Sequence, residues 1–223
     1  RMMSFARRCR RLIAGLSLAL AAPALAALDD PLKARAVALV DRQGPELTAL
    51  SDAIWRYAEI AFRETQSSDA LVGHARAAGF TVTRGTGDIP TAFVAEYGSG
   101  KPVIAIMGEF DALPGLSQDT VPTRSPLKPG APGHGCGHNV FGAASLGAAI
   151  TIRELIEAGE LSGTIRYYGT PAEEKFFGKL WMIRAGAFDD VDVMVDWHPS
   201  DKIEASVQSS QALVDFLVEF RGQ

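Results

Sequence analysis

The chain contains 223 residues, of which 47% are hydrophobic, 22% charged and 8% aromatic, and this composition is typical of a globular protein and excludes the disordered and fibrous classes. The length suits one large domain, or one domain and part of another. The net charge of −4, with no basic cluster after residue 11, argues against a nucleic-acid-binding surface.

The first 27 residues are predicted to be a signal peptide. Arginines cluster between positions 7 and 11, an apolar stretch follows at 12–25, and Ala24-Leu25-Ala26 supplies the small-x-small cleavage pattern. The alternative, a buried helix, leaves the arginine cluster unexplained. The apolar stretch is too short to span a membrane well, so we expect an exported protein, periplasmic or secreted, with no stable membrane anchor. After cleavage Cys136 would be the only cysteine, which excludes an internal disulfide.

Helical periodicity comes first along the mature chain. Apolar residues recur on one face over 29–62, with Pro45 expected to break the helix, and again over 67–78, where Gly79 ends the pattern. The period then changes to that of alternating strands and helices. Strands are predicted at 81–83, 91–95, 103–107, 164–168 and 191–195, and further helices at 143–156 and 179–185. Residues 112–137, rich in Gly, Pro and Ser, are predicted to be a long functional loop.

The alternation of strands and helices predicts an α/β layer fold with a mainly parallel sheet. Polar side chains follow three of the predicted strands, and ligands bind beyond the carboxyl ends of strands in such sheets. These side chains are Glu109 and Asp111, Glu173 and Glu174, and Asp196 and His198. We therefore expect a functional site at that edge of the sheet.

The strongest local signal is the segment 133–139, with the sequence GHGCGHN. Cys136 and His138 lie two residues apart in a glycine-rich loop that can bend both side chains toward one centre. A thiolate and an imidazole together suit zinc and related first-row metals. The alternative is a small buried cysteine beside loop histidines. Three of the four histidines fall in the motif regions, which favours a metal site, whereas His134 is left without a role, as a supporting or simple loop residue.

Glu173 and Glu174 directly follow a buried strand. Adjacent residues in a turn point in different directions, so one carboxylate can bind a metal while the other accepts a proton from water. A pair of glutamates alone is more often a solvated helix start. His198, at the end of the next strand, completes a ligand set with Cys136, His138 and Glu174.

Four motifs carry a family resemblance, in this order: 107–114 (MGEFDALP), 133–139 (GHGCGHN), 171–174 (PAEE) and 196–199 (DWHP). They resemble the amidohydrolase branch of the aminoacylase/carboxypeptidase-type dinuclear metallopeptidases, which includes hippurate and auxin-conjugate hydrolases. Within it, Glu109, Asn139 and the run 184–192 look most like the B-type chains of the aminobenzoyl-glutamate hydrolases. The likeness covers roughly residues 30–221.

The resemblance implies a zinc-peptidase-like catalytic domain, a three-layer α/β/α sandwich with a mixed sheet, and two divalent metal ions, Zn or Mn. It implies that Cys136 bridges the two ions and that His138, Glu174 and His198 are terminal ligands. Glu173 would be the general base, and Asp111 would orient a ligand histidine. Glu109 stands where the wider superfamily has a ligand histidine and is assigned no metal contact.

The domain prediction divides the chain into the signal peptide 1–27, the N-terminal part of the catalytic domain at 28–205, and the first strand of a lid domain at 206–223. Members of the family continue through the lid, which forms a homodimer or heterodimer, and supply two later histidines. We therefore expect this chain to be an incomplete, inactive fragment of the enzyme.

Two functions remain open from the sequence. The first is a metal-dependent hydrolase of N-acyl amino acids or small peptide amides, with aminobenzoyl-glutamate-like substrates. The second is a non-catalytic exported binding protein or pseudoenzyme that retains the pocket. The intact Glu173 favours the first.

Overall fold

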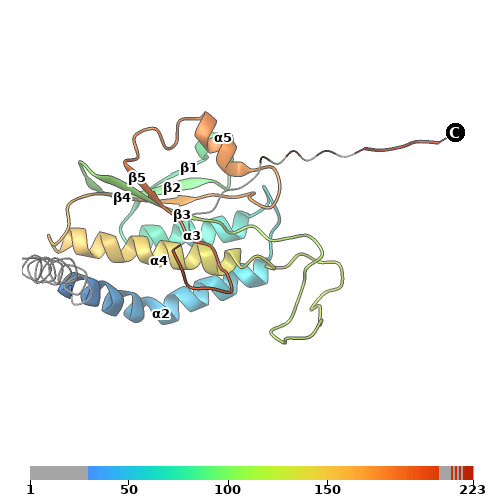
Figure 1. Ribbon diagram of the computed structural model, residues 1–223, viewed down its shortest axis with the longest axis horizontal. Coiled ribbons are helices and arrows are strands. Elements are labelled where there is room, and N and C mark those ends of the chain that lie inside the picture. The colour runs from blue at the N-terminus through green and yellow to red at the C-terminus, as the bar shows by residue number, and fades with distance from the viewer. Residues whose placement is uncertain (1–29, 206–211, 213, 215, 217, 223) are drawn as a thin grey trace, which may run out of the picture.

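The computed structural model describes residues 30–205, 212, 214, 216 and 218–222 (Figure 1). The predicted signal peptide and most of the predicted lid strand lie outside these residues. The described positions of that predicted strand, such as Phe216 and Phe220, are exposed and belong to no strand. Within the described part of the chain, no helix is long and apolar enough to cross a membrane.

A five-stranded sheet forms the centre of the molecule, with the strands in the order β1-β2-β4-β3-β5. Their bounds are β1 Thr81–Arg84, β2 Phe93–Ser99, β3 Val103–Gly108, β4 Gly163–Gly169 and β5 Val193–Val195. β3 is parallel to β4 and to β5, whereas β2 is antiparallel to both β1 and β4. The predicted mixed α/β sheet is confirmed, and its parallel part is the half that carries the candidate site.

Helices cover both faces of the sheet. α2 (Pro31–Tyr57), α3 (Thr65–Ala77) and α4 (His138–Glu157) lie on one face, and α5 (Gly178–Arg184) lies on the other (Figure 1). The larger core, between the three helices and the sheet, is built around fully buried side chains such as Leu71, Leu146 and Tyr167. A smaller core under α5 contains Ile89, Tyr168 and Met182. This arrangement is the expected three-layer sandwich.

α2 continues through Pro45, so the predicted break at that residue is wrong. A proline inside a helix costs about 3 kcal/mol because it removes one backbone hydrogen bond and crowds the preceding turn. Packing on both sides of Pro45 opposes that cost. Before it, Gln43 donates to Thr151 Oγ1 at 3.0 Å, and after it Leu47 lies against Gly147, where a Cβ atom would clash. α4 therefore holds both halves of α2 in one helix.

α4 begins at His138, five residues before the predicted start, because the glycine-rich motif leads straight into the helix. Gly137 has a φ of +80°, which only glycine adopts without strain, and no side chain caps the helix there. The preceding loop returns to its own start, since Leu113 and Gly133 exchange backbone hydrogen bonds of 3.0 and 3.1 Å. His138 is thus placed by a helix and the Cys136 region by a loop tied at its base.

Candidate metal centre

The carboxyl ends of β3, β4 and β5 meet at one edge of the sheet because these strands are parallel. Gly108 at the end of β3 is level with Gly169 at the end of β4, and Ile106 is level with Val195 of β5. The chain leaves each strand at this edge. The side chains delivered there are those predicted from the sequence, namely Glu109, Asp111, Glu173, Glu174, Asp196 and His198.

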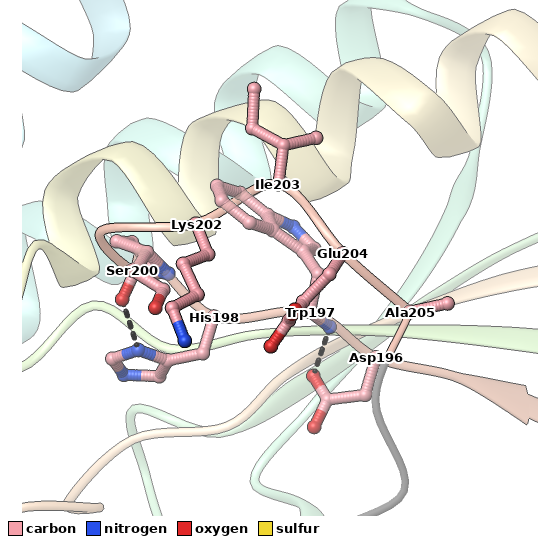
Figure 2. A pocket seen from close by; sticks show the side chains of 9 residues that line it. Asp196, Trp197, His198, Ser200, Lys202, Ile203, Glu204 and Ala205 are labelled. Carbon is pink, nitrogen blue, oxygen red and sulfur yellow. Dashed lines mark hydrogen bonds between the residues drawn. The ribbon is translucent and has the colours of Figure 1, made fainter.

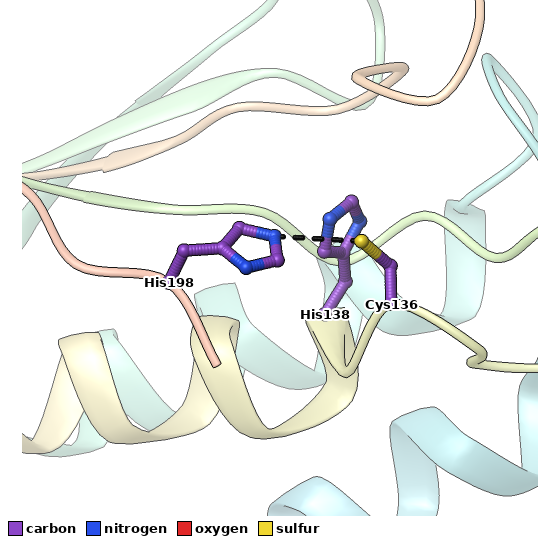
Figure 3. Close-up of side chains that lie close together, drawn as sticks. All are labelled: Cys136, His138 and His198. Carbon is purple, nitrogen blue, oxygen red and sulfur yellow. Dashed lines mark hydrogen bonds between the residues drawn. The ribbon is translucent and has the colours of Figure 1, made fainter. Parts of the chain in front are cut away.

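Cys136, His138 and His198 converge beyond this edge (Figure 3). One ligand atom from each lies within 4.8 Å of the other two, and Cys136 Sγ is 3.5 Å from His198 Nε2. The His198 Nδ1 atom is 2.9 Å from the Pro199 carbonyl oxygen, so Nδ1–H donates there. The lone pair of Nε2 is then directed toward the cysteine, as required of a metal ligand.

His138 is 0% exposed, and its two ring nitrogens face different partners. Nδ1 lies 3.0 Å from Asp111 Oδ1 and 3.1 Å from the Asp111 carbonyl oxygen, both acceptors, so Nδ1 is the protonated nitrogen. Nε2 lies 2.9 Å from Glu109 Oε2 and 3.9 Å from a carboxylate oxygen of Glu173 and of Glu174. The Nε2 lone pair and three carboxylates therefore surround one point.

Several atoms around that point have no hydrogen-bond partner. They are His138 Nε2, Glu109 Oε2 and Glu174 Oε1, all buried. Buried polar atoms are almost always paired, and acceptors that face one another without a donor are stabilised by a cation between them. The donor set of sulfur, imidazole and carboxylate is also the set that zinc and related divalent metals bind. The residues present therefore fit a metal centre.

The electrostatics of the protein alone point the same way. Burial and the neighbouring Glu174 raise the pKa of the Cys136 thiol to about 11. Burial would lower the pKa of His138, but hydrogen bonds to Asp111 and Glu109 raise it to about 10. Both groups thus hold their protons because the carboxylates create an excess of negative charge. A divalent cation would replace those protons.

Asp111 connects the ends of two strands. Its Oδ1 accepts from His138, and its Oδ2 accepts from the backbone N–H of Glu174 at 2.9 Å. Asp111 is fully buried, so both bonds are shielded from water. One carboxylate therefore fixes the tautomer of His138 and the position of Glu174 together.

Glu173 and Glu174 differ in their surroundings although they are adjacent. The Glu174 side chain is 14% exposed, and burial raises the pKa of its carboxyl group. The Glu173 side chain is 38% exposed and opens toward solvent. The buried carboxylate is suited to a metal ion and the open one to a substrate or water molecule.

Glu109 lies inside the cluster, although no metal contact was predicted for it. Its carboxylate forms a second possible ligand group with His138 and Glu173, and it also pairs with Lys179 of α5. Burial would raise the pKa of Glu109, but His138 and Lys179 lower it. Lys179 was not identified from the sequence, because nothing in a lysine at a helix start marks it as part of a site.

Two further residues were missed or left open. His134 is outside both ligand groups, because its Nε2–H donates to the Ile54 carbonyl oxygen at 3.0 Å, and burial lowers its pKa to about 4. Glu64, which had no sequence signal, is completely buried next to the site, and burial raises its pKa to about 7. His134 is therefore a neutral packing residue in this structure.

The segment after β5 closes one side of the site. Trp197 Nε1 donates to Ser145 Oγ of α4 at 2.9 Å and anchors this segment. Side chains from 196–205 then line a pocket of about 990 Å³ (Figure 2). Of the metal-centre side chains only His198 borders this pocket, so it lies beside the metal centre and does not enclose it.

Comparison with known proteins gives a consistent result. The family model described as peptidase family M20/M25/M40 matches residues 105–213. The chain is 47% identical over 175 residues to the B-type chain of p-aminobenzoyl-glutamate hydrolase from Escherichia coli K12, and the match covers 77% of this chain and 34% of that protein. It is 32% identical to the mouse Xaa-Arg dipeptidase, over 86% of this chain and 43% of the dipeptidase.

Among solved structures, a dinuclear metal-binding peptidase of the M20 family from Bacillus subtilis superposes with a TM-score of 0.58 and 26% identity. That superposition covers 69% of this chain and 43% of the peptidase. The chain therefore spans less than half the length of these relatives. The resemblance inferred from the four motifs is confirmed.

Proposed function

Because the chain belongs to peptidase family M20/M25/M40, we propose that the whole protein is a metal-dependent amidohydrolase that cleaves N-acyl amino acids or small peptide amides. The observation that carries this proposal is the convergence of Cys136, His138 and His198 with unpaired carboxylates at the ends of three strands. Neither a structural role nor simple ligand binding accounts for buried acceptors that lack donors.

Two divalent ions are proposed for the centre, with Zn or Mn as the metal. The ligands would be Cys136, His138, Glu174 and His198, and Glu109 lies close enough to contribute. Bound ions would polarise the amide carbonyl group and lower the pKa of the attacking water. Asp111 supports these ligands through its bonds to His138 and Glu174.

Glu173 is proposed as the general base. Its carboxylate is exposed, lies 3.9 Å from His138 Nε2, and can face both the metal centre and a substrate. In the reaction it would take the proton of the attacking water and pass it to the leaving nitrogen. Glu174, more buried and with an unpaired oxygen, is better suited to hold a metal ion.

The substrate and the partner are proposed by analogy with relatives. The 47% identical relative is named for p-aminobenzoyl-glutamate, an N-acyl amino acid, and its name also makes it one of the subunits of that hydrolase. We propose an N-acylated amino acid as substrate and a dimer, with a second copy or a related subunit, as the active form. Export is proposed only from the sequence of residues 1–27.

The decisive experiment compares Glu173→Gln and Glu174→Gln in the whole protein. Glu173→Gln should retain bound metal and lower kcat by roughly 10²–10⁴, because glutamine keeps the shape but cannot accept the proton. Glu174→Gln should instead lower the metal content measured by elemental analysis. Hydrolysis is followed with aminobenzoyl-glutamate and acetylated amino acids, with added Zn or Mn and with a chelator.

The outcomes separate the candidate functions. If the unaltered protein binds no metal after reconstitution, the proposed centre is wrong. If it binds metal but cleaves none of the N-acyl amino acids, the non-catalytic binding protein becomes the better explanation. Reversed behaviour of the two variants would exchange the roles of the two glutamates.

A further inference from the structure

The residue before the proposed base has an unusual backbone conformation. Ala172 has a φ of +60° and is completely buried. Non-glycine residues avoid this left-handed region at a cost of about 1 kcal/mol or more, and they persist there only when surrounding contacts hold them. Glu173 starts directly after this residue, so its direction depends on whatever keeps Ala172 in place.

The contact that holds Ala172 comes from a residue 108 positions earlier. The backbone N–H of Ala172 donates to Glu64 Oε1 at 2.9 Å. The same oxygen accepts from the backbone N–H of Phe62 at 2.9 Å, and the other oxygen accepts from Thr91 Oγ1 at 3.1 Å. Glu64 therefore joins three segments, and no atom of it reaches the candidate metal ligands through a hydrogen bond in the described structure.

The Glu64 side chain is held as firmly as the residue it holds. It is 0% exposed, and its own turn also contains a left-handed residue, Phe62, with a φ of +62°. Ala112, which follows Asp111, donates its N–H to the Glu59 carbonyl oxygen at 2.8 Å. The segment 59–64 is thus fixed against the ends of both β3 and β4.

We propose that Glu64 is a positioning residue that holds the Ala172 backbone in its left-handed conformation and thereby aims Glu173 at the reacting centre. The proposal rests on the proposed hydrolase function. Its effect should fall on Glu173 more than on Glu174, because the N–H of Glu174 is held separately by Asp111 Oδ2. Loss of Glu64 should therefore impair turnover while metal remains bound.

The geometry predicts that reach matters and negative charge does not. Both backbone N–H groups donate to one oxygen, Oε1, which a glutamine also provides. The glutamine nitrogen can donate to Thr91 Oγ1, because a hydroxyl group is both donor and acceptor. Aspartate keeps the charge but is one carbon shorter and cannot reach Ala172 in the same way.

The test compares Glu64→Gln, Glu64→Asp and Glu64→Ala in the whole metal-loaded protein. Glu64→Gln should keep kcat near that of the unaltered protein. Glu64→Asp and Glu64→Ala should lower kcat by roughly tenfold to a hundredfold, as expected when a catalytic group moves by about 1 Å. KM and the metal content measured by elemental analysis should change little.

A second substitution tests the mechanism directly. Ala172→Gly should restore part of the lost kcat when combined with Glu64→Asp, because glycine adopts a positive φ without strain and needs less support. Glu59→Ala is the matched control. Glu59 also accepts two backbone N–H bonds, from Gln66 and Ser67, but has no bond to residues 170–174. It should lower the melting temperature and leave kcat unchanged.

Each result decides a separate question. A Glu64→Gln variant as impaired as Glu64→Asp would overturn the proposal, as would full activity in both Glu64→Asp and Glu64→Ala. Equal kcat losses in Glu64→Asp and in the Glu59→Ala control would show a general effect on folding, and would also overturn it. Absence of hydrolysis by the unaltered protein would instead contradict the proposed function. If Glu64→Ala does not fold, the aspartate and glutamine variants still decide.

Discussion

The two histidines of the candidate centre belong to regions of very different character. His138 starts a long helix, is completely buried, and is fixed by the buried Asp111. His198 follows a strand of three residues, is exposed, and is fixed by the carbonyl group of its own neighbour. Both present Nε2 to the same place. One half of the site is therefore rigid before any ligand binds, whereas the other half depends on a short anchored loop.

Replacing each histidine should separate stability from metal binding. His138→Ala leaves the buried carboxylates of Asp111 and Glu109 without their partner, so the metal-free protein should lose about 3–5 kcal/mol of stability. His198→Ala should change stability by only about 0.5 kcal/mol, because the side chain is exposed. Both variants should lose metal affinity. Chemical denaturation and elemental analysis measure the two quantities, and equal destabilisation would contradict the contrast.

The rigid half should also carry a pH dependence of stability through Glu64. Burial raises its pKa from 4.5 to about 7, so the folded state retains a proton that the unfolded state has released between these values. The stabilisation is complete below pH 4.5 and is lost as the pH rises through 7, by about 3 kcal/mol. Glu64→Gln removes this loss, so its stability relative to the unaltered protein should increase over that range. Denaturation at about pH 5 and about pH 7.5 checks it, and a constant difference would refute it.

The smallest effect is expected where the exposed half is anchored. Ser145→Ala removes the hydrogen bond from Trp197, which should cost about 1 kcal/mol and weaken metal binding slightly through His198. Thr151→Ser is a control on the same helix, because it keeps the hydroxyl group bonded to Gln43. Metal titration compares the two variants. A loss of metal affinity as large as that of His198→Ala would mean that the loop has no other support.

The sequence predicted what local patterns determine. The apolar periodicity located the strands, and the polar residues at their ends were placed correctly at one edge of the sheet. The start of α4 was missed because Gly137 and His138 resemble loop residues, with no capping side chain to mark the helix. The continuity of α2 depends on packing against Gly147, far away in the sequence, which periodicity around Pro45 does not reveal.

The supporting residues of the site were also invisible to pattern analysis. Glu64 is one glutamate in a polar turn, and its importance comes from hydrogen bonds to Thr91 and Ala172, which are distant in sequence. Lys179 reaches Glu109 only because α5 folds back over the sheet. Motifs therefore identified the groups that face the reacting centre, whereas the groups that hold them became visible only in three dimensions.

The strand order has a consequence for how the molecule folds. β2 and β3 are consecutive in the chain, yet they do not pair, because β4 lies between them and hydrogen-bonds to both. The sheet therefore stays divided until residues 163–169 enter its middle, long after both neighbours have been synthesised. Such non-local pairing slows folding. The strand that completes the sheet also brings Glu173 and Glu174 to the site, so the catalytic edge and the interior of the sheet are assembled in one late step.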